Sequence, residues 1–136
     1  PLLKKIQEAE KELISISELE TEVLTKNSIR DLEYNTKQNH QELLKIYSEV
    51  SALGSLALGT ETTKMKKRPL FNAYNDVYNF ALRDEDDSQR KLNNLEQLAS
   101  VQEKMQKLAD IDTKELEKSV KKTDSIQEKI DAILKY

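Results

Sequence analysis

Residues 43–78 read LLKIYSEVSALGSLALGTETTKMKKRPLFNAYNDVY, and this stretch decides the expected fold. On both sides of its centre, apolar residues recur every three or four positions, which is the spacing of one face of an α-helix. Gly59, Pro69 and a group of basic residues stand between the two stripes and favour a connection. The stretch therefore predicts the tip of a long antiparallel helical hairpin.

The composition indicates long, thin helices. Apolar residues make up 37% of the 136 residues and charged residues 35%, whereas globular domains average about 45–50% apolar residues. Each helix can therefore bury only a stripe. A net charge of only −3 and the regular apolar spacing argue against disorder. The chain has no Cys, which excludes disulfides, thiolate metal sites and cysteine nucleophiles.

The first half of the chain predicts one long helix. No Gly or Pro lies between Pro1 and Gly54, and we expect the helix over about residues 2–58. At the start of this helix the apolar residues have alternating spacings of four and three, as along the contact line of a heptad repeat, and we call this line the heptad seam. The seam comprises Leu2, Ile6, Ala9, Leu13 and Ile16. After a slip across residues 17–25, the pattern resumes with Ile29, Leu32, Thr36, Asn39, Leu43, Ile46, Val50 and Leu53. The register therefore shifts once within a continuous helix.

A second long helix is expected after the connection. Pro69 suits the first position of a helix, and we expect this helix over about residues 69–110. Residues 83–91 contain no apolar side chain. A helix can run through such a gap, which is the interpretation we favour, or it can break there with Asp87 or Ser88 as a new cap.

A third helix is expected at the end of the chain. Asp112, followed three residues later by Glu115, predicts the cap of a helix over about residues 113–136. By length the whole chain, residues 1–136, forms a single helical domain. Because it begins at Pro1 without an initiator Met, we expect it to be a piece of a larger protein.

Two polar stretches suggest how the helices pair. If the first two helices are antiparallel, residues 33–42 and residues 83–91 come side by side. The predicted fold class is therefore all-α, an elongated antiparallel three-helix coiled-coil bundle. Residues 40–82 would protrude from this bundle as a two-helix hairpin arm.

A two-helix arm cannot cover its own apolar stripe. The exposed stripe would consist of Leu43, Ile46, Val50, Leu53, Phe71, Tyr74, Val77 and Tyr78. Such patches mark partner surfaces, and covering one contributes roughly 25 cal/mol per Å² of apolar area. We therefore expect an oligomer interface at these residues, with a second copy or a helical partner protein.

A basic cluster marks the expected hairpin tip. It consists of Lys64, Lys66, Lys67 and Arg68. These residues could contact an anionic membrane, where each is worth about 1 kcal/mol, or an acidic protein surface, or they could simply keep a connection solvated. We expect no nucleic acid partner, because the chain is acidic overall and no helix has a basic face.

His40 is the only histidine in the chain. It falls in the polar stretch of the first helix, where an acidic neighbour such as Asp84 or Asp86 would favour its charged form. That pairing would be sensitive to pH. The other interpretation is an exposed or half-paired residue.

Residues that could carry chemistry are scarce. The acidic run at residues 84–87 lacks the Gly and the ligand spacing of an EF-hand loop, so we expect solvated surface or pairing with Lys37, Lys91 or a partner. One His and no Cys leave no nucleophile and base pair, and no phosphate-binding or dinucleotide-binding glycine motif occurs. We expect no enzyme, no cofactor, no metal and no small-molecule substrate.

Residues 47–61, YSEVSALGSLALGTE, are similar to the small, Leu-rich segments with a Glu that recur in the BAR domains of sorting-nexin-type membrane-remodelling proteins. The order of parts also resembles that family, with a first helix of nearly 60 residues that shifts register, a second long helix and a third turned back on it. The resemblance extends over about 110 residues. It implies a curved dimer that acts on phosphoinositide-bearing endosomal membranes.

These patterns predict a non-catalytic helical scaffolding and oligomerisation module within a larger assembly, with membrane trafficking as the favoured setting. The alternative is a BAR-like module that binds membranes or generates curvature through the basic cluster. No apolar run approaches the roughly 20 residues that span a bilayer, and the amino end has no signal-peptide pattern. We therefore expect an intracellular, cytoplasmic protein, peripheral to a membrane in the alternative.

Overall fold

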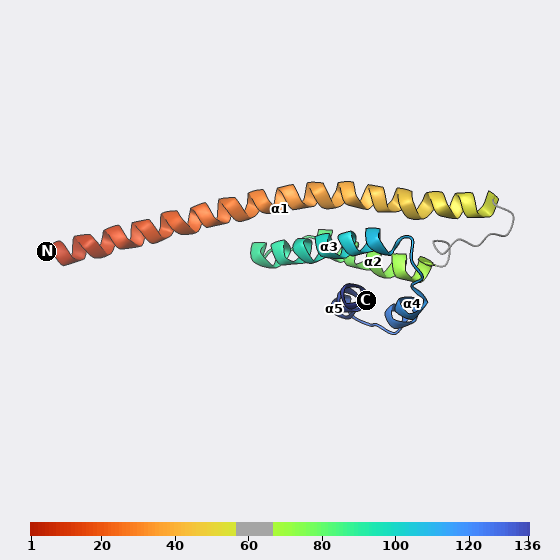
Figure 1. Cartoon of the computed structure of the whole chain (residues 1–136). Helices are drawn as coiled ribbons and strands as arrows, with labels where there is room; N and C mark the ends of the chain where they lie inside the picture. Colours follow the sequence, from red (N-terminus) through yellow and green to blue (C-terminus); the bar gives the residue numbers. More distant parts are fainter. Residues whose placement is uncertain (57–66) are drawn as a thin grey trace.

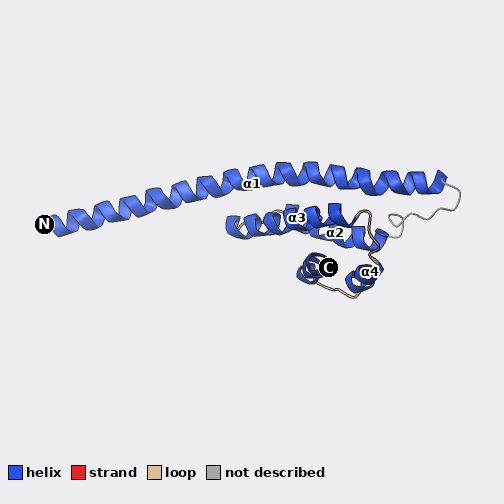
Figure 2. Cartoon of the chain, viewed as in Figure 1, coloured by secondary structure: helices blue, strands red, loops and turns tan. Residues whose placement is uncertain are grey.

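A computed structural model describes the backbone of residues 1–56 and 67–136, and the side chains of residues 1–47 and 67–136. Within these ranges the chain folds into helices alone (Figures 1 and 2). They are α1 (Leu2–Leu56), α2 (Arg68–Leu82), α3 (Ser88–Leu108), α4 (Lys114–Lys121) and α5 (Ile126–Lys135). The predicted all-α fold class is confirmed.

α1 is one uninterrupted rod of 55 residues, about 80 Å long at 1.5 Å per residue. The absence of Gly and Pro before Gly54 allows this length. Its start agrees with the prediction. The end predicted near residue 58 lies outside the described residues.

The single helix predicted over residues 69–110 is wrong, because two helices, α2 and α3, occupy this range. The break lies at residues 83–87, the segment for which a break was the alternative. Asp87 has an extended backbone, and its carboxylate accepts a hydrogen bond from the Arg90 N–H at 3.1 Å. This cap starts a new helix at Ser88, and no apolar side chain in the gap offers packing that would favour a continuous helix.

The last predicted helix, over residues 113–136, is also two helices. Ser125 caps α5 by accepting from the Glu128 N–H at 3.1 Å, and the Glu128 carboxylate accepts from the Asp124 N–H at 3.1 Å. This reciprocal arrangement is close to a capping box, and it begins α5. At the start of α4 the N-cap is Thr113, one residue after the predicted Asp112.

The helices form three layers. α2 and α3 lie side by side in the middle, α1 covers one side of them, and α4 and α5 cross the other side, seen nearly end-on (Figure 1). α2 runs antiparallel to α1, since His40 contacts Tyr78 whereas Tyr47, further along α1, contacts Phe71. α3 turns back and runs in the same direction as α1 (Figure 1).

The core lies between these layers, where residues 29–47 of α1 pack against α2–α5. Its buried apolar residues are Leu43, Tyr47, Leu70, Ala73, Tyr74, Val77, Ala81, Leu95, Leu98, Val101, Met105, Leu108, Ala109, Leu116, Val120, Ile130 and Ile133. The described ends of the arm predicted over residues 40–82, residues 40–47 and 67–82, therefore do not protrude, because the turn at residues 83–87 folds α3 back against them. Residues 2–24 of α1 protrude instead (Figure 1).

The polar stretches of α1 and of the α2–α3 connection do lie side by side. The Lys91 ammonium is 3.7 Å from the Glu33 carboxylate. The prediction that these two stretches come level is confirmed at this pair.

Candidate functional site

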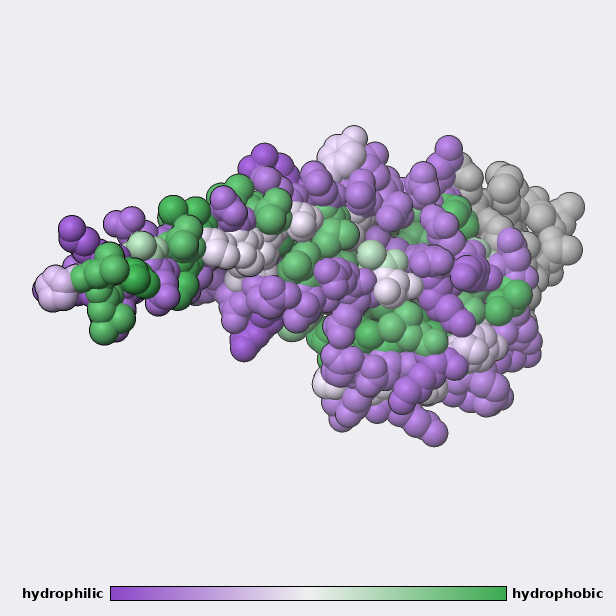
Figure 3. All heavy atoms as spheres, turned by 60° about the vertical axis from the view of Figure 1, so that its left-hand side comes forward, coloured by the Kyte–Doolittle hydropathy of each residue, from purple (hydrophilic) through white to green (hydrophobic). Residues whose placement is uncertain are grey.

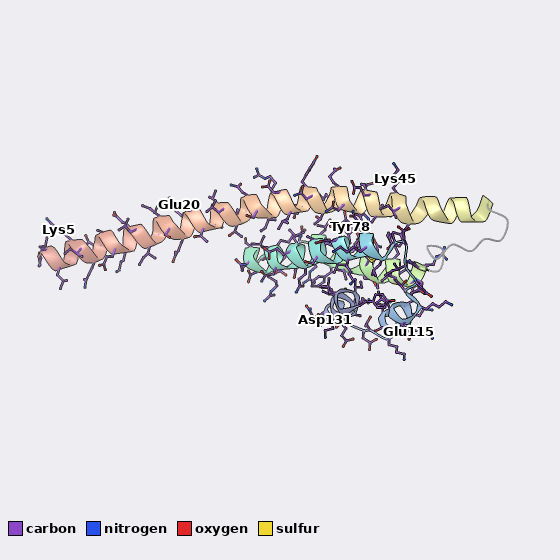
Figure 4. All side chains as sticks on the ribbon, in the orientation of Figure 1. Lys5, Glu20, Lys45, Tyr78, Glu115 and Asp131 are labelled. Atoms are coloured by element: carbon purple, nitrogen blue, oxygen red, sulfur yellow. The ribbon has the colours of Figure 1, made fainter. Side chains whose placement is uncertain are left out.

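The protruding part of α1, residues 2–24, is the most apolar exposed surface among the described side chains, and we call it the α1 extension. Figure 3 shows its apolar side chains gathered at one end of the molecule, and Figure 4 shows that the side chains around Lys5 and Glu20 have no other helix beside them. Its exposed apolar residues are Leu2, Leu3, Ile6, Leu13, Ile14, Ile16, Leu19, Val23 and Leu24. A run of this length marks an interaction surface.

A shallow apolar depression lies on the α1 extension. Ile16, Leu19, Val23 and Leu24 line it, together with Glu20. Because these residues are three or four positions apart, their side chains share one side of the helix. The depression therefore offers a place for an apolar side chain of a partner helix.

The interface predicted around the hairpin tip is instead part of the core. Leu43, Tyr74 and Val77 are at most 1% exposed, and Ile46, Phe71 and Tyr78 are half-buried against the same core. The side chains of Val50 and Leu53 lie outside the described residues. The prediction of a bare stripe here is wrong for the buried residues, because α3 of the same chain covers them.

The predicted basic cluster is not a continuous exposed patch. Lys67 is 1% exposed, and its ammonium donates to the backbone carbonyls of Leu108 and Ile111 at the end of α3. Arg68 is exposed in the first turn of α2. Lys64 and Lys66 lie outside the described residues. Lys67 was therefore wrongly predicted as a surface contact.

Lys91 has the corresponding role at the other end of the α2–α3 pair. Its buried ammonium donates to the carbonyls of Ala81 at 2.8 Å and Arg83 at 2.6 Å, where α2 ends. In an antiparallel pair the start of each helix lies beside the end of the other, so each lysine meets carbonyls without helical partners and the negative end of a helix dipole. Sequence analysis missed both roles. The carbonyls that accept from Lys67 are far from it in the sequence, and those that accept from Lys91 belong to the end of a helix that was predicted to continue.

His40 lies in a buried polar cluster between α1, α2 and α3. Its Nδ1 is 2.6 Å from the Tyr74 hydroxyl, and its ring stacks on Tyr78 with centroids 3.7 Å apart. Gln102 donates to the Tyr74 hydroxyl at 3.3 Å and to the Thr36 carbonyl at 2.9 Å. The predicted acidic neighbour is wrong, since aromatic rings and an amide surround the imidazole.

Burial sets the protonation of this cluster. It lowers the pKa of His40 and raises the pKa of Tyr74 to about 12. The Tyr74 hydroxyl accepts from Gln102 and so has its own proton to donate to His40 Nδ1, which assigns the ring proton to Nε2. The folded protein therefore holds a neutral imidazole.

Stability is expected to fall when the pH is lowered through the range in which His40 titrates. Because the folded-state pKa is lowered, the unfolded chain takes up this proton first, so the stabilisation is complete above the ordinary value near 6.5 and is lost below it. Urea unfolding at a series of pH values between about 8 and 5.5 measures the effect. His40→Gln should lack this part of the pH dependence, and an unchanged slope in that variant would contradict the assignment.

The acidic run lines a hollow of mixed charge. Its lining consists of Ile29, Glu33, Lys37, Leu82, Asp84, Glu85, Ser88 and Lys91. Glu85 pairs with Arg83 at 3.5 Å. Asp84, Asp86 and Asp87 are exposed, as the solvated-surface interpretation expected, and the ion pair of Glu85 is with Arg83 and not with the predicted Lys37 or Lys91.

Among the described residues, no three His, Asp or Glu side chains are grouped so that they could hold a metal ion. None of the helices in the described ranges has a stretch that is both long and apolar enough to cross a membrane. Comparison with protein-family models, with curated proteins and with solved structures finds no match to this chain.

Proposed function

We propose that the protein is a non-catalytic helical scaffolding and oligomerisation module, which assembles through the α1 extension. The observation that carries this proposal is the row of exposed apolar side chains over residues 2–24, on a helix that leaves the bundle without a neighbour among the described residues. A helix of this kind gains most of its stability in proteins from packing its apolar side. The extension is therefore suited to receive another helix.

The bundle supports the scaffolding part of the proposal. Residues 29–47 of α1 join the same core as α2–α5, so the rod is anchored at one end and projects from a packed base (Figure 1). α1 crosses from base to extension without a break. A partner bound to the extension would thereby be held at a fixed direction from the base, which is what a scaffold requires.

Leu13→Asp tests the proposal. Leu13 lies in the middle of the heptad seam and is exposed, so a carboxylate there would be buried unpaired in an assembly. We expect self-association to weaken on the order of 100-fold. Light scattering after size-exclusion chromatography measures the mass, which should exceed the monomer value of 15.7 kDa for the unmodified chain.

Ser15→Asp is the matched control, because it adds the same charge two residues away on the other side of the helix. It should leave the mass unchanged. At a concentration where the chain is monomeric, urea unfolding of the bundle should be the same in both variants, since neither residue touches the core. A monomer in the unmodified chain at high protein concentration would contradict the proposal.

A further inference from the structure

The heptad seam of α1 and the side of α1 that packs on the bundle face opposite directions. The seam continues beyond Ile16 with the same alternating spacing through Glu20, Val23 and Asn27. Ile16 and Thr36, which is buried against the bundle, are about 200° apart around the axis at 100° per residue. At the register shift the apolar side of α1 therefore moves to the opposite side of the helix. The seam before the shift faces away from the bundle and stays accessible.

In heptad notation the seam supplies both core positions of a coiled coil. The a positions are Ile6, Leu13, Glu20 and Asn27, and the d positions are Leu2, Ala9, Ile16 and Val23. The seam extends over almost four heptads, and six of its eight positions are apolar, the exceptions being Glu20 and Asn27. The asparagine at an a position is a feature that fixes register and the number of strands.

We propose, resting on the function proposed above, that the occupant of the seam is a second copy of this chain, parallel and in register. In this arrangement each g residue faces the e residue five positions later in the other helix. Lys5 then meets Glu10 of the second copy, and Lys26 meets Asp31 of the second copy. Lys26 is exposed and already lies 3.2 Å from Glu22 of its own helix, so it can bridge carboxylates of both chains.

The other g and e positions agree with this arrangement. Leu19 meets Leu24 of the second copy, which extends the apolar contact beyond the seam, and Glu12 meets the neutral Ser17. Both leucines also line the apolar depression. No pair of g and e residues from Lys5 to Asp31 has like charges, so charge complementarity favours the parallel dimer.

An antiparallel dimer of the same length is disfavoured by its charges. Placing Leu13 opposite Ile16 of the second copy gives the fullest overlap of the seam, and g residues then face g residues. Lys5 would meet Lys26 of the second copy, and the repulsion would occur twice by symmetry. The parallel arrangement contains one unfavourable layer over this length, where Glu20 meets its own copy.

The bundles do not obstruct the parallel dimer. α2–α5 all lie on one side of α1 (Figure 1), and the seam lies on the other. Two chains joined along their seams would therefore have their bundles on the outer sides of the two-helix rod, at the same end.

Cysteine cross-linking tests this inference, because the chain has no Cys of its own. In a parallel dimer in register, Asn27→Cys places the two introduced thiols in one core layer, within reach of a disulfide. We expect mild oxidation to convert most of this variant to a covalent dimer on a non-reducing gel. Lys11→Cys, at an outer position of the same helix, is the matched control and should stay largely monomeric.

The antiparallel arrangement predicts a different set of cross-links. It separates the two copies of residue 27 by roughly 37 Å along the axis and brings residue 27 beside residue 2. Cross-linking only in a mixture of Leu2→Cys and Asn27→Cys chains would overturn the parallel arrangement and leave the proposed function intact. A chain that stays monomeric by sedimentation at high concentration, with no cross-link at Asn27→Cys, would overturn both.

Discussion

Replacing Leu43 by Ala is expected to lower the free energy of unfolding by about 2–5 kcal/mol. Leu43 is 0% exposed in the core between α1 and the α2–α3 layer. The substitution removes buried methyl groups and leaves a cavity that the packed neighbours fill only in part. Urea unfolding followed by circular dichroism measures the change.

Leu19→Ala is the matched control for this substitution. Leu19 lies on the same helix but is 61% exposed, so its replacement should change the stability of the monomer by no more than about 0.5 kcal/mol. Both variants should be measured at a concentration where the chain is monomeric. Equal losses in the two variants would show that the bundle does not bury Leu43 as described.

Lys91→Met is expected to destabilise the fold by about 2–4 kcal/mol. Methionine keeps most of the aliphatic stem but removes the ammonium, which leaves the carbonyl of the buried Ala81 without its donor and Glu33 without its partner. The end of α2 would also lose the positive charge beside its dipole. Chemical unfolding of the purified chain measures the loss.

Lys107→Met provides the comparison within the same helix. Lys107 pairs with Glu103 at 3.6 Å, but both side chains are more than 70% exposed, so its removal should change stability by no more than about 0.5 kcal/mol. A loss at Lys91 no larger than the loss at Lys107 would mean that the buried ammonium does not stabilise the end of α2.

The sequence predicted the features that depend on neighbouring residues. The absence of Gly and Pro predicted an unbroken α1 through the described residues, and Pro69 placed the start of α2 to within one residue. The polar stretches were expected to come level along two antiparallel helices. Glu33 and Lys91 do meet, but Lys91 lies on α3, beyond the turn that was not predicted.

The remaining features depend on contacts between distant residues. Apolar spacing shows that a stripe must be covered, but it does not show by what, so the stripe at Leu43 was assigned to a partner and the seam at Leu13 to the bundle. The structure instead buries the stripe at Leu43, because a turn at residues 83–87 supplies α3 as the cover, and it leaves the seam at Leu13 exposed. That turn was hard to foresee, since charged residues are good helix formers and only Asp87 marks a cap.

The candidate site was predictable in kind but not in place. An exposed apolar stripe was expected on the two-helix arm, whereas the exposed apolar side chains lie on residues 2–24. Lys67 and His40 were predicted as exposed or charged because sequence shows a titratable group but not its surroundings. Their burial comes from the end of α3 and from two tyrosines of α2.

The two buried lysines have a consequence for how the molecule opens. Helix termini ordinarily fray first, independently of one another, because their last carbonyls bond only to water. In the α2–α3 pair, Lys67 fastens the final turn of α3 and Lys91 the final turn of α2. Neither helix can unravel from its carboxyl end without displacing the opening turn of its neighbour, so the two should melt together as one cooperative unit.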